Sequence, residues 1–134
     1  MPQVAVKIID ETPGGEILKE IKLSFLLGDE VLKVRDILKA RVYKEVEVYN
    51  KKLPEYFNGL VQPTDAEKTL NGYKMRIRKL INPEEQYQSA LNAFKQNVFF
   101  ILVDHKQVES LDEEVVIDKF STVSFVKLTP LIGG

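Results

Sequence analysis

Residues 120–134 read FSTVSFVKLTPLIGG, and this closing stretch decides the fold that we expect for the chain. Residues 121–128 alternate as a β-strand does, with Val123 and Phe125 on one face and Val126 and Leu128 on the other. No helix or second strand follows. Residues 129–134 are therefore expected to form a tail that no later element uses.

The tail ends on Gly133 and Gly134. Glycine loses the most conformational entropy on ordering and buries no side chain, so two glycines are a poor end for a packed element. An extended peptide that ends in a carboxylate is, by contrast, well suited to entering a narrow enzyme channel. The sequence thus indicates the Gly134 carboxylate as the candidate functional group.

The composition is that of an ordinary soluble domain and disfavours several function classes. The chain has 134 residues, 44% hydrophobic and 29% charged, which fits a single domain with a real core. Nineteen basic and twenty acidic residues give a net charge of −1, so we expect no nucleic-acid partner and no membrane partner. There is no cysteine, which excludes disulfides and thiolate metal sites. No signal peptide or membrane span is evident, so a cytoplasmic location is expected.

The first fifty residues predict a hairpin followed by a helix. Two alternating runs, residues 3–9 and 16–25, flank the turn at residues 13–15. Asp29 is a plausible N-cap for a helix that ends near Asn50. Apolar residues spaced three or four apart form one stripe on this helix: Val31, Val34, Leu38, Val42, Val46 and Tyr49.

Residues 51–97 are the least regular part and are expected to be an insertion on the core. Turn signals are closely spaced, and three elements are predicted: a short helix at 63–67, an edge strand at 73–79, and a second helix from Pro83 to about residue 97. The basic residues of the edge strand form either an anion contact or, with more weight, a solvated face: Lys74, Arg76, Arg78 and Lys79. The apolar run at 98–103 then predicts a central strand, and residues 104–107 a turn.

Without the insertion, the order is strand, strand, helix, strand, short connection, strand and a Gly-Gly tail. This order resembles the ubiquitin-like β-grasp, an α+β fold in which a ββαββ mixed sheet packs on a helix. Residues 99–114 and 122–126 resemble the second half of ubiquitin in strand spacing and in the Lys106-Gln107 turn. The ending LTPLIGG also resembles the tail of the sulfur-carrier subunit of molybdopterin synthase. The chain most resembles the bacterial ubiquitin-like modifiers that are encoded beside conjugation enzymes.

The resemblance implies a protein modifier that is not itself an enzyme and binds no cofactor stably. A separate activating enzyme would use ATP and Mg²⁺ to adenylate Gly134, and the acyl group would then form an isopeptide bond with a target protein. Pro130 would stiffen the tail, and Leu131 and Ile132 would offer apolar anchors. The implied partners are homologues of the activating enzyme, a conjugating enzyme and a deconjugating protease, and the implied role includes antiphage defence.

Two other functions remain open. One is a sulfur carrier with a C-terminal thiocarboxylate, which the large insertion disfavours because such carriers are usually compact. The other is a non-covalent β-grasp adaptor. If a partner grips the sheet, Phe100, Leu102, Val126 and Leu128 are the expected patch, unless the insertion covers them. The lone His105 sits in an expected turn, so no catalytic residue and no metal site are predicted.

Overall fold

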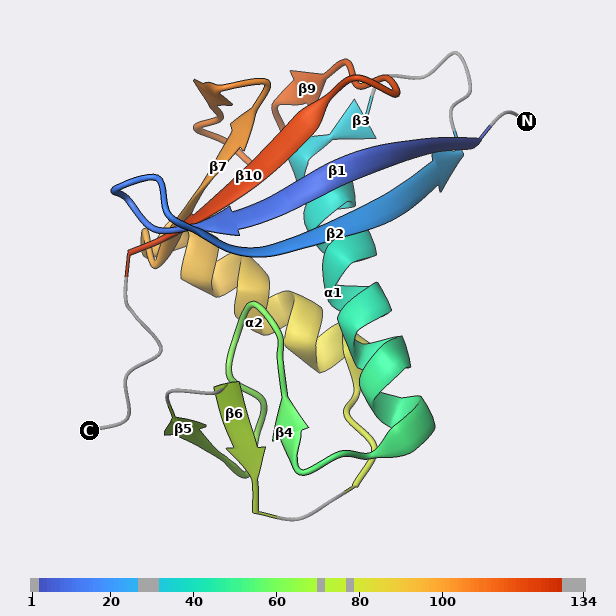
Figure 1. The fold of residues 1–134 in the computed structure, drawn as a ribbon, viewed down its shortest axis with the longest axis vertical. Helices are drawn as coiled ribbons and strands as arrows, with labels where there is room; N and C mark the ends of the chain where they lie inside the picture. The colour runs from blue at the N-terminus through green and yellow to red at the C-terminus, as the bar shows by residue number, and fades with distance from the viewer. Residues whose placement is uncertain (1–2, 27–31, 70–71, 77–78, 129–134) are drawn as a thin grey trace.

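The computed structural model describes residues 3–26, 32–69, 72–76 and 79–128. It is an α+β structure in which a mixed sheet packs on helices (Figure 1). The sheet has the order β2-β1-β10-β7-β8, with β1 and β10 parallel and the other pairs antiparallel. The strands of this sheet are β1 (Gln3–Glu11), β2 (Ile17–Leu26), β7 (Phe99–Val103), β8 (Lys106–Gln107) and β10 (Thr122–Lys127). The two helices are α1 (Val34–Lys52) and α2 (Pro83–Lys95).

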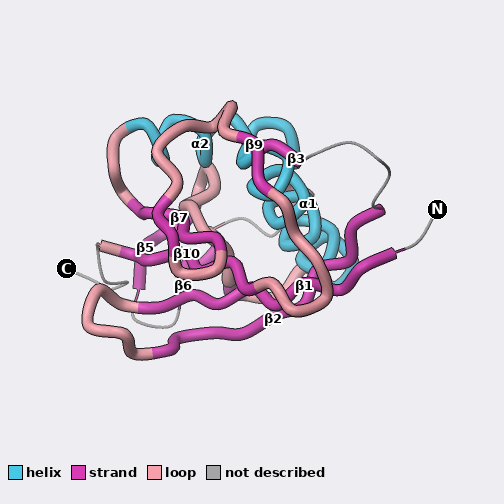
Figure 2. The backbone as a smooth tube through the Cα atoms, turned by 90° about the horizontal axis from the view of Figure 1, so that it is seen from above, coloured by secondary structure: helices cyan, strands magenta, loops and turns pink. Residues whose placement is uncertain are grey.

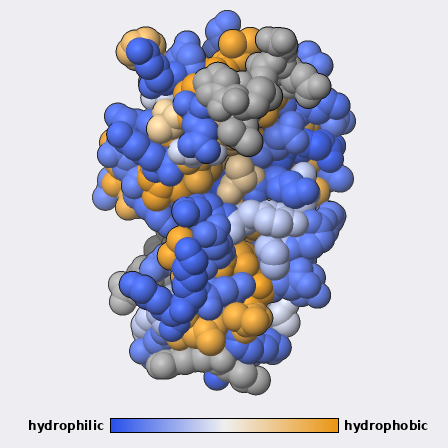
Figure 3. Space-filling view, turned by 90° about the vertical axis from the view of Figure 1, so that its right-hand side faces the viewer, coloured by the Kyte–Doolittle hydropathy of each residue, from blue (hydrophilic) through white to orange (hydrophobic). Residues whose placement is uncertain are grey.

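The core lies between the sheet and α1. Alternate residues of β1 and β10 turn inward, so that Val6, Ile8, Val123 and Phe125 are fully buried. The predicted stripe of α1 is confirmed for its described members, which are all buried: Val34, Leu38, Val42, Val46 and Tyr49. The opposite side of α1 is exposed, and Figure 3 shows that this side of the molecule is mostly hydrophilic with apolar areas between. The predicted hairpin is also confirmed, and Figure 2 shows it along one border of the molecule with both helices toward the other.

The first helix begins later than its sequence predicts. Residues Leu32–Lys33 form a short strand, β3, that pairs with β9 (Glu114–Val115), and α1 starts only at Val34. The Lys33 N–H donates to the Asp36 carboxylate at 3.0 Å, which caps the first turn. The predicted cap Asp29 and the stripe residue Val31 lie outside the described residues. Pairing with a strand about eighty residues further along the chain therefore sets this boundary.

The insertion contains a three-stranded sheet that the sequence did not predict. Its strands are β4 (Tyr56–Phe57), β5 (Ala66–Thr69) and β6 (Gly72–Met75), in the order β4-β6-β5. The predicted helix at 63–67 is wrong, because Asp65 has a left-handed backbone (φ 60°) and Ala66 already belongs to β5. The predicted strand at 73–79 is confirmed for Tyr73–Met75, which belong to β6, but its predicted position at an edge is wrong. Its described strand, β6, is paired on both sides.

Basic residues of this region pair with nearby acids. The Lys74 and Glu55 side chains approach to 3.6 Å, and those of Lys79 and Asp65 to 3.1 Å. Arg76 is exposed, and Arg78 lies outside the described residues. The basic face is thus largely the solvated, ion-paired surface that was given more weight.

The second helix joins the small sheet to the rest of the molecule. Asn82 caps α2 by accepting from the Glu84 and Glu85 amides at 2.9 and 3.1 Å, as its position before Pro83 predicts. The helix ends at Lys95, two residues earlier than predicted. In Figure 1, α2 lies between the main sheet and the small sheet. No helix in the described part is long and apolar enough to cross a membrane.

Candidate functional site

The predicted conjugation residues lie outside the described part of the structure. These are Pro130, Leu131, Ile132, Gly133 and Gly134. The structure does fix the point from which they depart. β10 is held between β1 and β7, and the Leu128 N–H donates to the Val98 carbonyl at 3.3 Å. The tail therefore starts from a strand that is anchored on both sides.

The four residues of the predicted patch lie together on the outer face of the sheet. Val126 is the direct cross-strand partner of Phe100, and Leu102 lies on the same face of β7. Phe100, Leu102 and Val126 are half-buried, and Leu128 is 39% exposed. Their neighbours in the sequence point the other way into the core, as the alternation predicts: Ile101, Val103, Val123 and Phe125. A role of this patch in partner binding stays a prediction.

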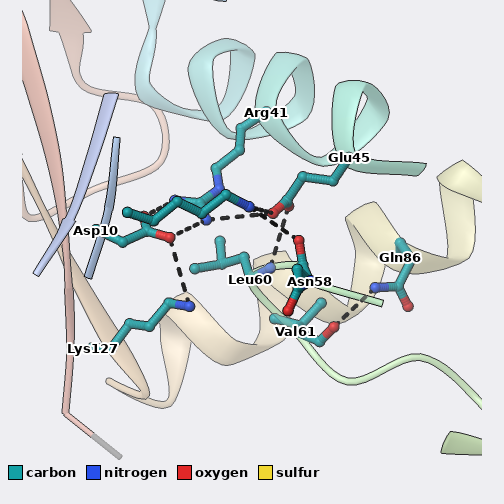
Figure 4. Close-up of polar contacts among 9 residues, drawn as sticks. Asp10, Arg41, Glu45, Asn58, Leu60, Val61, Gln86 and Lys127 are labelled. Carbon is teal, nitrogen blue, oxygen red and sulfur yellow. Dashed lines mark hydrogen bonds and ion pairs between the residues drawn. The ribbon is translucent and has the colours of Figure 1, made fainter. Parts of the chain in front are cut away.

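A buried cluster of charges lies where β1, α1 and β10 meet (Figure 4). Arg41 is fully buried, and both of its terminal nitrogens donate to the Asp10 carboxylate, one of them at 2.6 Å. The Arg41 guanidinium also donates to Glu45 at 3.4 Å and stacks over the Phe125 ring at 4.4 Å from its centre. Lys127 reaches the same Asp10 carboxylate at 3.6 Å. Lys127, the last residue of β10, therefore contacts Asp10 on β1.

The environment shifts the pKa values of Asp10, Arg41 and Lys127. Burial alone would raise the pKa of Asp10, but the hydrogen bonds and the charge of Arg41 hold it below its ordinary value. Burial would lower the pKa of Arg41, yet Glu45 and Asp10 raise it above the ordinary value. For Lys127 burial dominates, and its pKa is lowered despite the attraction of Asp10. Arg41 and Asp10 thus stabilise each other's charged forms, whereas burial disfavours the charged form of Lys127.

The same cluster ties the insertion to the main sheet. The Glu45 carboxylate accepts from the Leu60 amide at 3.2 Å and lies 3.8 Å from the Lys19 ammonium. Lys19, on β2, donates in turn to the Asn58 carbonyl at 3.1 Å. Glu45 therefore connects α1, β2 and the segment that follows β4.

A groove of about 310 Å³ opens next to this cluster, between α2, the small sheet and the base of β7 and β10. Val98 and Lys127 stand at the end from which the tail departs. The walls are apolar with a few polar groups, and their residues are Leu60, Val61, Gln62, Lys68, Tyr73, Ser89, Ala93, Val98, Phe99 and Lys127.

His105 is exposed in the turn between β7 and β8, with a left-handed backbone (φ 71°). Within the described ranges, no three His, Asp or Glu side chains gather closely enough to hold a metal ion.

Sequence reasoning missed the buried cluster, although the signal was present. Arg41 falls on the buried stripe of α1, between Leu38 and Val42, and Asp10 continues the inward series of Val6 and Ile8. A charged side chain at a buried position needs an oppositely charged or hydrogen-bonding partner. Each residue alone marks a buried charge, but only the fold shows that the two meet.

No protein-family model, curated protein or solved structure matches the chain.

Proposed function

We propose that the protein is a bacterial ubiquitin-like modifier with a β-grasp fold, whose Gly134 carboxylate is activated by a separate enzyme and transferred to a target protein. The observation that carries the proposal is the strand order β2-β1-β10-β7, in which the first and last long strands are parallel neighbours at the centre. Together with a helix that follows the first hairpin and packs on the sheet, this order supports the proposal of a β-grasp. The Gly-Gly sequence follows the central strand.

The geometry supports a presented tail in two ways. β10 is bonded on both sides, which gives the peptide that leaves it a fixed origin. From Leu128, six further residues reach Gly134. A fully extended chain of that length spans roughly 20 Å, enough to enter an active site on another protein. Glycine at the end of the chain lets the carbonyl approach a nucleotide without a β-carbon in the way.

The chemistry divides between this chain and its partners. The Gly134 carboxylate attacks the α-phosphorus of ATP, and pyrophosphate leaves. A partner cysteine then displaces AMP to give a thioester, because this chain contains no cysteine. A target amine finally displaces the thiol to form an amide bond. The activating and conjugating enzymes bind the patch formed by Phe100, Leu102, Val126 and Leu128. A few apolar residues supply most of the binding energy in such contacts.

The test combines the protein, ending at Gly134, with a bacterial homologue of the activating enzyme, Mg²⁺-ATP and radiolabelled pyrophosphate. We expect exchange of the label into ATP and, with the remaining partners, attachment to protein amines seen by mass spectrometry. Deletion of Gly133 and Gly134 abolishes both, whereas Gly14→Ala, in an open turn, changes neither. Replacement of one carboxylate oxygen by sulfur would instead identify a sulfur carrier. Exchange that survives the deletion would overturn both covalent functions.

A further inference from the structure

We propose that the groove beside Lys127 binds the chain's own C-terminal segment, residues 129–134, and shields its carboxylate until a partner displaces it. The purpose of this shielding rests on the proposed function, but the contact itself does not. The segment is the occupant that fits the position, the lining and the charge of the groove.

The position of the groove favours the chain's own tail over other peptides. Val98 and Lys127 line the groove, and Leu128 is bonded to Val98, so residue 129 begins at its end. A peptide tethered at this point has an effective concentration on the order of millimolar. A second copy or an unrelated peptide at micromolar concentration would have to bind far more tightly to compete.

The lining of the groove matches the composition of the tail. Six of its ten residues are apolar or aromatic, which suits Leu131 and Ile132: Leu60, Val61, Tyr73, Ala93, Val98 and Phe99. Its volume of about 310 Å³ is at the lower end of the range for ligand pockets and suits a short peptide rather than a folded partner. An extended segment with two adjacent apolar residues can place one of them against these walls.

The charged residues that line the groove favour binding of an anion. Lys68 and Lys127 line it and no acid does. Lys127 already contacts Asp10, but Lys68 is half-buried and forms no ion pair with any carboxylate in the described ranges. Residues 129–134 contain no charged side chain, so in a protein that ends at Gly134 the terminal carboxylate is their only charge. Docking of the tail would bring that carboxylate within reach of an unpaired ammonium group.

A pair of introduced cysteines tests the contact directly, because the natural chain has none. Ser89 lines the groove, whereas Gln88, the preceding residue of α2, is equally exposed but lies outside the lining. In the full chain, Ser89→Cys with Ile132→Cys should form an intramolecular disulfide about tenfold faster or more than Gln88→Cys with Ile132→Cys. Equal rates for the two pairs, or disulfides that form mainly between two copies, would overturn the proposal.

A second measurement uses no new crosslink. Carboxypeptidase should release Gly134 several-fold faster from Lys68→Glu than from the unmodified chain, because the new acid repels the carboxylate. Lys106→Glu, the same change at an exposed site on β8, should leave the rate unchanged. Equal release from all three proteins, with unchanged circular dichroism, would contradict docking. Neither assay contains an activating enzyme, so failure here leaves the result of the adenylation test to decide the proposed function separately.

Discussion

Arg41 carries a positive charge at a position where its neighbours on α1 bury apolar side chains. Removing a guanidinium from water costs several kcal/mol, which the charges and hydrogen bonds of Asp10 and Glu45 offset. The contact with the Phe125 ring adds to this. The pair is therefore costly to form but far more costly to break.

Arg41→Met tests this balance, because it keeps much of the side-chain length and removes the charge. We expect a loss of about 3–5 kcal/mol in the free energy of unfolding, since two buried carboxylates lose their partner. Urea denaturation followed by circular dichroism measures it. Lys51→Met is the matched control on the same helix: Lys51 is exposed and, among the described residues, forms an ion pair with Glu47 alone, so the change should cost less than about 1 kcal/mol. Similar losses for both variants would show that Arg41 contributes no more than a surface pair.

Because of Asp10, the free energy of unfolding should fall at low pH. Its pKa in the folded protein lies below the ordinary value of 3.8, so its contribution is complete above that value and is lost as the pH falls through the folded pKa. Urea denaturation at a series of pH values from about 6 to 2 should show a decline that is steeper for the natural chain than for Asp10→Asn. Parallel curves for the two proteins would contradict the assignment.

At the scale of elements, the small sheet depends on the backbone of Gly72. This residue begins β6 with φ of 114°, and a β-carbon built on it would lie 2.5 Å from the Asn58 side-chain oxygen and 3.1 Å from the Phe57 carbonyl. Both the conformation and the contact exclude a larger residue.

Gly72→Ala should therefore lower the free energy of unfolding by about 1–3 kcal/mol, through strain and the separation of β4 from β6. Thermal unfolding measures the loss. Gly14→Ala gives the control, because its nearest neighbour, the Thr12 hydroxyl oxygen, lies 3.8 Å from the added carbon. A melting temperature for Gly72→Ala equal to that of the control would show that the site can relax.

Some helices and strands could be predicted from local sequence patterns, and others could not. Alternation predicted β1, β2 and β10, an apolar run predicted β7, and three-to-four spacing predicted the stripe of α1, because each of these buries a face against the core. In the insertion, local patterns predicted α2 and part of β6 but failed at residues 63–67. A capping pattern at Thr64 and Glu67 favoured a helix, but pairing of Ala66–Thr69 with β6 prevailed. That pairing, like the contact of Arg41 with Asp10, joins separate segments, so the local sequence does not show which two residues meet.

At the scale of the whole molecule, Glu45 connects the two sheets. Its carboxylate contacts Arg41 beneath the main sheet and Lys19 on β2, and it accepts from the Leu60 amide after β4. Asn50 and Gln86 provide separate links: the Asn50 side chain bonds both backbone groups of Ile81, and Gln86 donates to the Val61 carbonyl. The small sheet is thus held at several points, of which only Glu45 reaches the charged cluster under β10.

Glu45→Ala should loosen the small sheet more than the main one. The Leu60 amide would lose its partner and Lys19 would lose one of two, at a cost of about 1–3 kcal/mol, while Arg41 would still pair with Asp10. Hydrogen exchange should then quicken by about tenfold or more at residues 56–60 and 72–75, and less at β1 and β10, because local opening no longer breaks this link. Glu47→Ala, an exposed neighbour on α1, should change neither region. Uniformly faster exchange in both sheets would show instead that the molecule opens as one unit, and that the insertion and the strand that leads to the tail share a single cooperative structure.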